Sequence, residues 1–289
     1  MTAYTIVRIL TTASLAGLLF EVGLRLSLLE VRDALRDHAR LMRVVVANFL
    51  LVPVLALLLV ALMAVPRDPA VAILLLAAAP FAPVVPIFTK MVRADLALAA
   101  SLTALFPFLS AFLTPLVCET GIRFIAGAGT LSFSVVKILI VLLLTITLPL
   151  AAGVAVHHWM PALGQRLQKP IEIIADGAGA ISLTFVTWVE WSSIVHTGWK
   201  PLLTMAMNSE LSLALGYAIG GPTRAARRVV AFGSSNRNIA LAILVAIDSF
   251  AGTPIFPAVV ACGLLLIFLG LGHVAYWRFL SQEQGRGGA

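Results

Sequence analysis

Nine long apolar runs occupy nearly the whole chain, and each could cross a lipid bilayer as a helix. They span residues 5–29, 39–64, 69–92, 94–118, 134–158, 167–189, 199–220, 223–250 and 253–280. A hydrocarbon core of about 30 Å needs roughly 20 helical residues. Only 11% of the 289 residues are charged, against about 25% in a soluble domain. Because transmembrane β-strands alternate in polarity and these runs do not, the sequence predicts an all-α membrane protein with nine transmembrane helices.

Basic residues gather in alternate loops between these runs. If the N-terminus is outside, the inner loops receive most of the lysines and arginines, and the outer side receives only Arg8, Arg67, Arg123, Lys137 and Lys200. Cytoplasmic loops are enriched in such residues. We therefore predict a multi-pass protein of the inner cell membrane with its N-terminus outside and its C-terminus in the cytoplasm. Because the net charge of +7 is spread over these loops, it does not indicate a nucleic-acid partner.

The order of the helices predicts an internal symmetry within a single transmembrane domain, residues 1–289. Four helices in residues 5–118 and four in 167–280 would form two repeats, joined by a linking helix at 134–158. One linking helix makes the second repeat enter the membrane from the opposite side. The two halves are then inverted repeats, an arrangement common in secondary transporters.

The third helix of each predicted repeat is interrupted near the middle of the membrane. Residues 80–86 (PFAPVVP) contain three prolines, and residues 233–238 (GSSNRN) contain no aliphatic side chain. Proline removes a backbone donor and clashes with the preceding turn, and non-helical backbone at membrane depth persists only where it faces protein or a cavity. We expect two discontinuous helices that cross at a binding site. A proline kink and a polar helix contact are the simpler alternative.

Several segments resemble the bile acid:sodium symporter family. They are residues 23–26 (GLRL), 47–53 (ANFLLVP), 80–98 with the helix start RADLAL, and 236–242 (NRNIALA). The resemblance implies two inverted repeats, two crossed discontinuous helices, and transport of organic anions such as bile acids. It also implies that the first, fifth and sixth helices form a panel against a core of the other six.

The resemblance does not extend to the sodium ligands. In coupled members a Ser-Asn pair, a Glu and a Gln bind two sodium ions, and the aligned residues here are Val85, Pro86, Gly233 and Arg237. A hard cation needs oxygen ligands, which these side chains lack. We therefore expect a transporter that is not coupled to sodium. A symporter with a different ion site is an alternative.

Arg237 is the principal candidate for binding the substrate. A charged side chain near the bilayer centre costs at least about 2.5 kcal/mol to insert and is functional by default. We predict that its guanidinium, which stays protonated, faces a substrate carboxylate in the loaded carrier, and Glu210 or Asp176 in the empty one. A purely structural ion pair is the alternative. The predicted substrate-binding residues are Arg237, Asn236, Asn238, Ser234, Ser235, Pro83, Pro86 and Thr103.

Other functional classes fit the sequence less well. It contains no phosphate-binding loop, no Gly-x-Ser-x-Gly motif and no His-Glu-x-x-His motif, so we predict neither an enzyme nor a cofactor or metal site. An arsenite efflux transporter would share the architecture, but its chemistry favours a thiolate, and neither Cys118 nor Cys262 lies at an interruption. The sequence therefore favours a secondary transporter of a small organic anion. It leaves the oligomeric state open.

Overall fold

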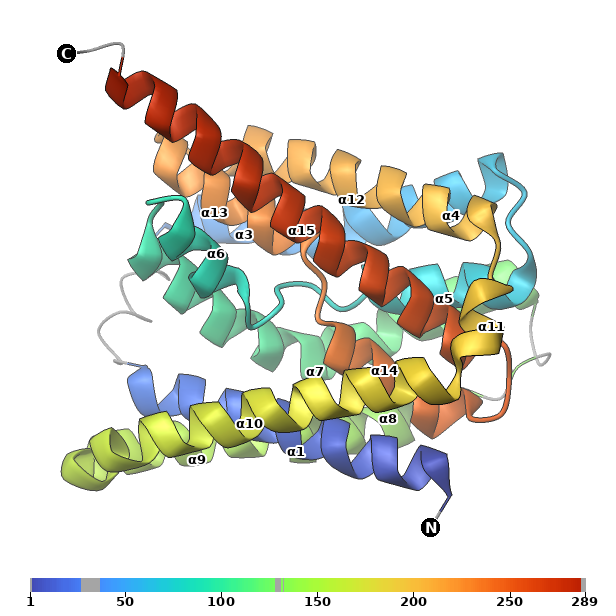
Figure 1. Ribbon diagram of the computed structural model, residues 1–289, viewed down its shortest axis with the longest axis horizontal. Helices are drawn as coiled ribbons and strands as arrows, with labels where there is room; N and C mark the ends of the chain where they lie inside the picture. Colours follow the sequence, from blue (N-terminus) through green and yellow to red (C-terminus); the bar gives the residue numbers. More distant parts are fainter. Residues whose placement is uncertain (1, 27–36, 128–130, 132, 287–289) are drawn as a thin grey trace.

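The computed structural model describes residues 2–26, 37–127, 131 and 133–286, and these are almost entirely helical (Figure 1). Two of the long helices contain one π-helical turn each, η1 and η2. The elements of the first half are α1 (Ala3–Arg25), α3 (His38–Val46), η1 (Ala47–Leu51), α4 (Val52–Leu62), α5 (Arg67–Ala77), α6 (Val85–Met91) and α7 (Leu96–Ala126). The rest are α8 (Val135–Leu142), η2 (Leu143–Thr147), α9 (Leu148–Trp159), α10 (Pro161–Val189), α11 (Trp191–Val195), α12 (Trp199–Ile219), α13 (Arg224–Ser235), α14 (Ile239–Phe250) and α15 (Ile255–Arg286).

In the described residues, eight helical segments are long and apolar enough to cross a membrane. The remaining predicted segment, 69–92, is divided into α5 and α6, and each of these is shorter than one span. The fold is all-α, as predicted, and the divided segment is one of the two expected discontinuous helices. The total of nine spans stays a prediction, as does the inverted relation between residues 5–118 and 167–280.

Side-chain caps set several helix starts, as their sequences favour. Asp95 caps α7 by accepting a hydrogen bond from Leu98 N, and Asn238 caps α14 by accepting one from Leu241 N. Asp37 caps α3 in the same way, and the backbone N–H and guanidinium of Arg40 lower the pKa of its carboxyl. Each cap satisfies a backbone donor that the first turn leaves unpaired.

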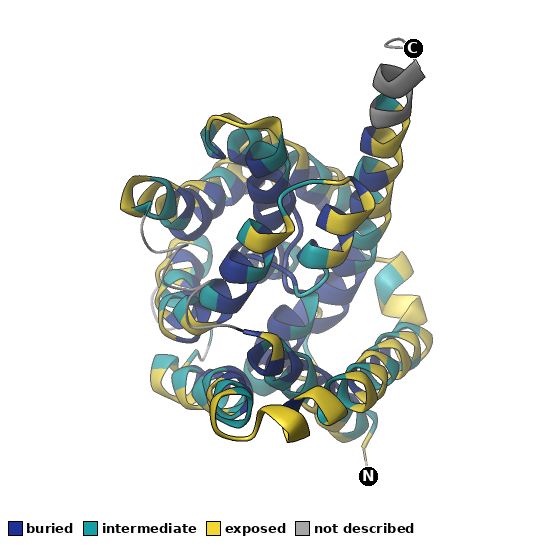
Figure 2. Cartoon of the chain, turned by 90° about the vertical axis from the view of Figure 1, so that its left-hand side faces the viewer, coloured by how far each residue is buried: buried dark blue, intermediate teal, exposed yellow. Residues whose placement is uncertain are grey.

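The helices form two groups. We call α1, α8–η2–α9 and α10 the panel, and the remaining helices the core. In Figure 1 the panel lies along the lower edge, with α1 packed against both α9 and α10. Gly23 and Gly153 let α1 and α9 approach closely, since a Cβ on either would overlap backbone atoms of the other helix. Figure 2 shows buried residues concentrated where the helices pack together. Buried residues of α1, α8 and η2 share one hydrophobic cluster with residues of α5, α14 and α15, so the panel packs along one side of the core.

The two discontinuous helices meet at their breaks. Residues 78–84 separate α5 from α6, and residues 236–238 separate α13 from α14. Two backbone hydrogen bonds join the breaks, Ala82 N to Asn236 O (3.1 Å) and Asn238 N to Ala79 O (2.8 Å), and a third joins Phe81 N to Gly233 O of α13 (3.2 Å). The expected crossing is therefore present. The second break is shorter than the predicted 233–238, because residues 233–235 still belong to α13.

Candidate functional site

Arg237 lies at the second break and is only 2% exposed. Its Nη1 donates a hydrogen bond of 3.3 Å to Asn48 Oδ1. Within the described part of the chain, its buried Nη2 has no hydrogen-bond partner and no carboxylate forms an ion pair with it. A buried charge is stable when it is paired and hydrogen-bonded. The protein therefore presents a buried cation with spare donor capacity.

Asn48 holds the guanidinium in place and was not predicted as a site residue. It lies in the π-helical turn η1 and is fully buried. Its Nδ2 donates to Val44 O (2.9 Å) and to Ser234 Oγ (3.0 Å), which directs its Oδ1 towards Arg237. The available signal was an amide within an apolar run, in a segment already noted for its family resemblance.

The other polar residues of the second break are occupied within the protein. Asn236 Nδ2 donates to Phe232 O (3.1 Å) and Ser235 Oγ (3.2 Å), and Asn238 caps α14. Ser234 accepts from Asn48. These side chains therefore fix the shape of the break. Among the described residues of this segment, Arg237 has a buried side-chain donor, Nη2, without a hydrogen-bond partner.

A cavity of about 490 Å³ lies between the panel and the crossing, within the usual range for small-molecule sites. The core contributes Arg237, Asn236 and Asn238 from the second break, and residues 82–84 from the first. The panel contributes α1 and α10. Most of the remaining lining is aliphatic. The lining is therefore mainly apolar, with one arginine, one aspartate and several uncharged polar residues.

Three predicted residues fall in different places around this cavity. Pro83 lines it. Pro86 lies in the first turn of α6 and is not part of the lining. Thr103 is buried on α7, away from the lining, and its hydroxyl has no hydrogen-bond partner among the described residues. Of the two prolines predicted for the substrate site, Pro83 therefore lies at the cavity and Pro86 does not.

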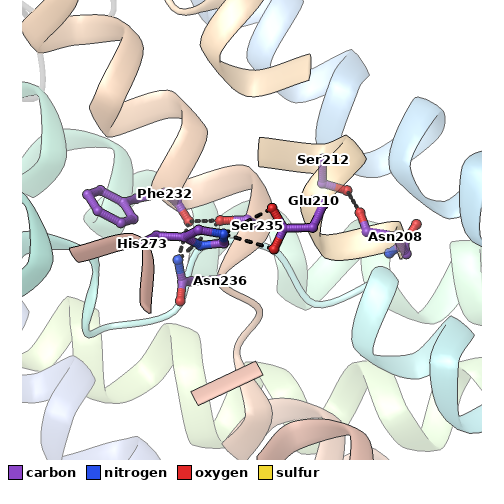
Figure 3. Close-up of polar contacts among 7 residues, drawn as sticks. All are labelled: Asn208, Glu210, Ser212, Phe232, Ser235, Asn236 and His273. Atoms are coloured by element: carbon purple, nitrogen blue, oxygen red, sulfur yellow. Dashed lines mark hydrogen bonds and ion pairs between the residues drawn. The ribbon is translucent and has the colours of Figure 1, made fainter. Parts of the chain in front are cut away.

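The two carboxylates proposed as partners of Arg237 also separate. Asp176 of α10 lines the same cavity as Arg237. Glu210 of α12 instead pairs with His273 of α15, at 2.9 Å between Oε1 and Nε2, and does not line the cavity (Figure 3). In this conformation Glu210 is therefore not the partner of Arg237, because its carboxylate is directed to another helix.

The panel adds hydroxyl groups that sequence reasoning did not single out. Thr11 and Ser14 of α1 and Ser182 of α10 line the cavity, and the hydroxyls of Thr11 and Ser182 are 2.7 Å apart. Gly179 lets the two helices approach, because a Cβ there would press on Ser14 Oγ. These small polar residues interrupt apolar helices, but such residues also serve ordinary helix packing, so the sequence did not distinguish them.

The cavity offers little to a metal ion. In the described ranges no three His, Cys, Asp or Glu side chains are arranged to hold one. Cys118 and Cys262 are buried and do not line the cavity. A site built on thiolates, as a metalloid carrier would favour, is therefore not formed by these cysteines.

Two comparisons with known proteins bear on the chain. A family model described as the sodium bile acid symporter family matches residues 12–214. None of the curated protein sequences compared with the chain matches it. The matched residues begin within α1, include Asn48 and the first break, and end within α12, before α13. The second break with Arg237 therefore lies outside the match.

Proposed function

Since the chain belongs to the sodium bile acid symporter family, and is accordingly a multi-pass membrane transporter, we propose that it is a secondary transporter of a small organic anion that works without sodium. The substrate binds at the crossing of the two breaks, in the cavity between panel and core. Its acidic group meets Arg237, and its apolar part lies against the aliphatic wall.

The observation that carries this proposal is the buried guanidinium with an unpaired Nη2 at the break. Moving a cation out of water is expensive, and a partner of opposite charge recovers part of that cost. A carboxylate or sulfonate supplies both the charge and the acceptor oxygens. The N-terminus of α14, which begins two residues after Arg237, adds a favourable dipole for an anion.

The same guanidinium supports transport without sodium. It occupies the position at which the resemblance placed a sodium ligand, and it supplies a fixed positive charge where coupled relatives have a bound ion. A cation next to it would be repelled. When the carrier is empty, Asp176 is the proposed partner of Arg237, because it lines the same cavity.

The two-layer arrangement supports alternating access. The panel and the core are separate groups with the cavity between them, so a rocking motion of one against the other can expose the site to each side in turn. We propose that the N-terminus is outside. Single cysteines at Ala39 and Ala251, in a background without Cys118 and Cys262, should be labelled by an impermeant reagent from the inside and the outside respectively. The opposite pattern reverses the topology.

Uptake by proteoliposomes tests the proposal. The probes are carboxylates from acetate to cholate, and taurocholate as a sulfonated bile acid. We expect at least one of them to exchange across the membrane through the protein, at the same rate in sodium and in choline buffers. A steep dependence on sodium would contradict the proposed mechanism. Absence of exchange for every probe would contradict the substrate class.

A further inference from the structure

Glu210 and His273 form a hydrogen-bonded pair on the outer face of the core, away from the cavity. Glu210 Oε1 and Oε2 lie 2.9 and 3.1 Å from His273 Nε2. The side chain of Glu210 is 48% exposed, whereas that of His273 is 15% exposed. The neighbouring side chains Leu211 and Leu271 are also exposed. Since α12 and α15 are both candidate spans, this face meets lipid.

Charge in lipid constrains the protonation of such a pair. A carboxylate with a neutral imidazole carries a net negative charge, whereas one added proton makes the pair neutral overall. An uncompensated charge facing hydrocarbon is costly, so the two side chains are placed where each can offset the charge of the other. Histidine is also the side chain that exchanges a proton near neutral pH. The buried Nδ1 of His273 has no partner among the described residues, so no second hydrogen bond fixes the state of the ring.

The pair is connected to the crossing through α15. Gly270 lies one turn before His273, and a Cβ at Gly270 would overlap Asn236 Oδ1. Trp277 lies one turn after His273 and packs edge-to-face on Phe232, with ring centroids 4.7 Å apart. Figure 3 shows His273 beside the end of α13. The segment of α15 that carries His273 therefore contacts the end of α13 and the second break.

The other ionisable groups on helices packed against α12 and α15 are concentrated towards helix ends or on the panel. Arg67 pairs with Asp68, and Asp248 pairs with Arg8. The other ionisable groups on α12, on α15 and on the helices packed against them are His38, Arg40 and Arg43 of α3, Arg67 and Asp68 of α5, Lys90 of α6, Arg166, Lys169, Glu172 and Asp176 of α10, Arg224, Arg227 and Arg228 of α13, Asp248 of α14, Lys200 and Tyr217 of α12, and Tyr276 and Arg278 of α15.

We propose that the Glu210–His273 pair binds the coupling proton of this transporter. The coupling step of this proposal rests on the proposed function, because a coupling ion needs a transported substrate. One proton enters the pair with each anion that enters the cavity, and contact between α15 and the second break links the two events. The proton replaces sodium as the coupling ion, and it binds at the Glu210–His273 pair instead of in the substrate cavity.

The first test needs no substrate. Protein with ring-¹⁵N histidine in lipid nanodiscs is titrated between about pH 5 and 8 by NMR, and His273→Gln identifies the signal. We expect the His273 ring to gain and lose one proton over this range, and to stay neutral in Glu210→Gln. A His273 signal that does not change with pH in the wild type would overturn the proposal.

The second test follows taurocholate, which does not cross bilayers as a neutral acid. Under an inward proton gradient, wild-type proteoliposomes should accumulate it several-fold above equilibrium. His273→Gln and Glu210→Gln should exchange it without accumulating it, because only coupling is lost. His196→Gln, which changes an exposed histidine at the end of α11, is the matched control and should accumulate it normally.

The outcomes separate the two proposals. Accumulation by His273→Gln and Glu210→Gln at the wild-type level would overturn the proton site while leaving anion transport intact. If wild-type vesicles move no taurocholate and none of the other probes, the proposed function fails. In that case the NMR titration alone decides the proton site: a titrating ring supports it and a fixed ring overturns it.

Discussion

The two breaks at the crossing serve one architectural purpose and are built from different residues. The first, at residues 78–84, contains Pro80 and Pro83 among apolar side chains, and Phe81 adopts a left-handed backbone conformation (φ 56°). The second, at residues 236–238, is polar throughout. The first ends a helix by removing backbone donors, and the second by offering side-chain hydrogen bonds that compete with the helix.

This difference assigns different work to the two breaks. The N–H groups of Phe81 and Ala82 are used in hydrogen bonds to Gly233 of α13 and Asn236 of the second break, and the side chains of the first break are apolar. The first break thus supplies an apolar part of the cavity lining and the backbone donors that hold its partner. In the proposed function, charge recognition belongs to the second break, where Arg237 has a buried donor without a partner among the described residues. Substitutions in the two breaks should therefore affect stability and binding in different proportions.

The largest effect on stability should come from the point where the breaks touch. A Cβ on Gly233 would lie within the ring of Phe81, which is itself stacked on Phe106 at 4.1 Å between centroids. We expect Gly233→Ala to destabilise the protein by about 1–3 kcal/mol through overpacking, seen as a lower melting temperature in detergent. Gly272→Ala, where a Cβ meets nothing within 4 Å, is the control. Equal melting temperatures for the two variants would show that the crossing is loosely packed.

The next effect should come from the residue that holds Arg237. Asn48→Ala leaves Arg237 Nη1 and Ser234 Oγ without this partner, and should cost about 1–3 kcal/mol in thermal unfolding together with weaker anion binding. Asn208→Ala is a sharp control, because Asn208 is equally buried and its amide has no partner among the described residues. If Asn208→Ala is as damaging as Asn48→Ala, the hydrogen bonds of Asn48 are not what matters.

A smaller effect is expected from the cap of α14. Asn238→Ala removes the hydrogen bond to Leu241 N and should cost about 1 kcal/mol. Asp95→Ala removes the equivalent cap of α7, away from the crossing. We expect similar losses of stability from both, and weaker anion binding from Asn238→Ala alone. Binding that falls equally in both variants would mean that helix capping acts only through stability.

The smallest effect on anion binding is expected in the first break. Pro83 lines the cavity with an apolar ring, so Pro83→Ala should change the affinity for cholate by no more than about fourfold, the effect of about 0.8 kcal/mol for one lost methylene contact. Titration in nanodiscs measures this. A loss as great as that of a variant in the second break would erase the distinction between the two breaks.

The sequence predicted the helical membrane fold and both interruptions, because apolar length, proline clusters and polar runs are local signals. It could not predict the ends of the second break, since Gly233 to Ser235 are held in α13 by contacts with α12 and the first break. It also missed the π-helical turn that places Asn48, because nothing in an apolar run fixes the rotation of a helix.

The charged partners were harder to predict than the charges themselves. Arg237 was identified as a buried cation, and it is buried. Glu210 was expected opposite it, but pairs with His273, because spacing along the chain does not say which face of α12 meets which helix. Asp176 lies at the cavity because α10 packs on α1. This packing brings together residues that are far apart in sequence.

Anion binding by variants of Arg237 tests the central claim most directly. The wild type, Arg237→Gln, Arg237→Lys and the control Arg43→Gln, which changes an exposed arginine of α3, are titrated in nanodiscs with the tightest-binding probe. We predict a loss of about 10- to 100-fold or more for Arg237→Gln, as expected for one hydrogen bond to a charged group. Arg237→Lys should restore part of it, because the planar fork is lost, and Arg43→Gln should bind normally. Normal binding by Arg237→Gln with a lowered melting temperature would contradict the account and make Arg237 a structural residue.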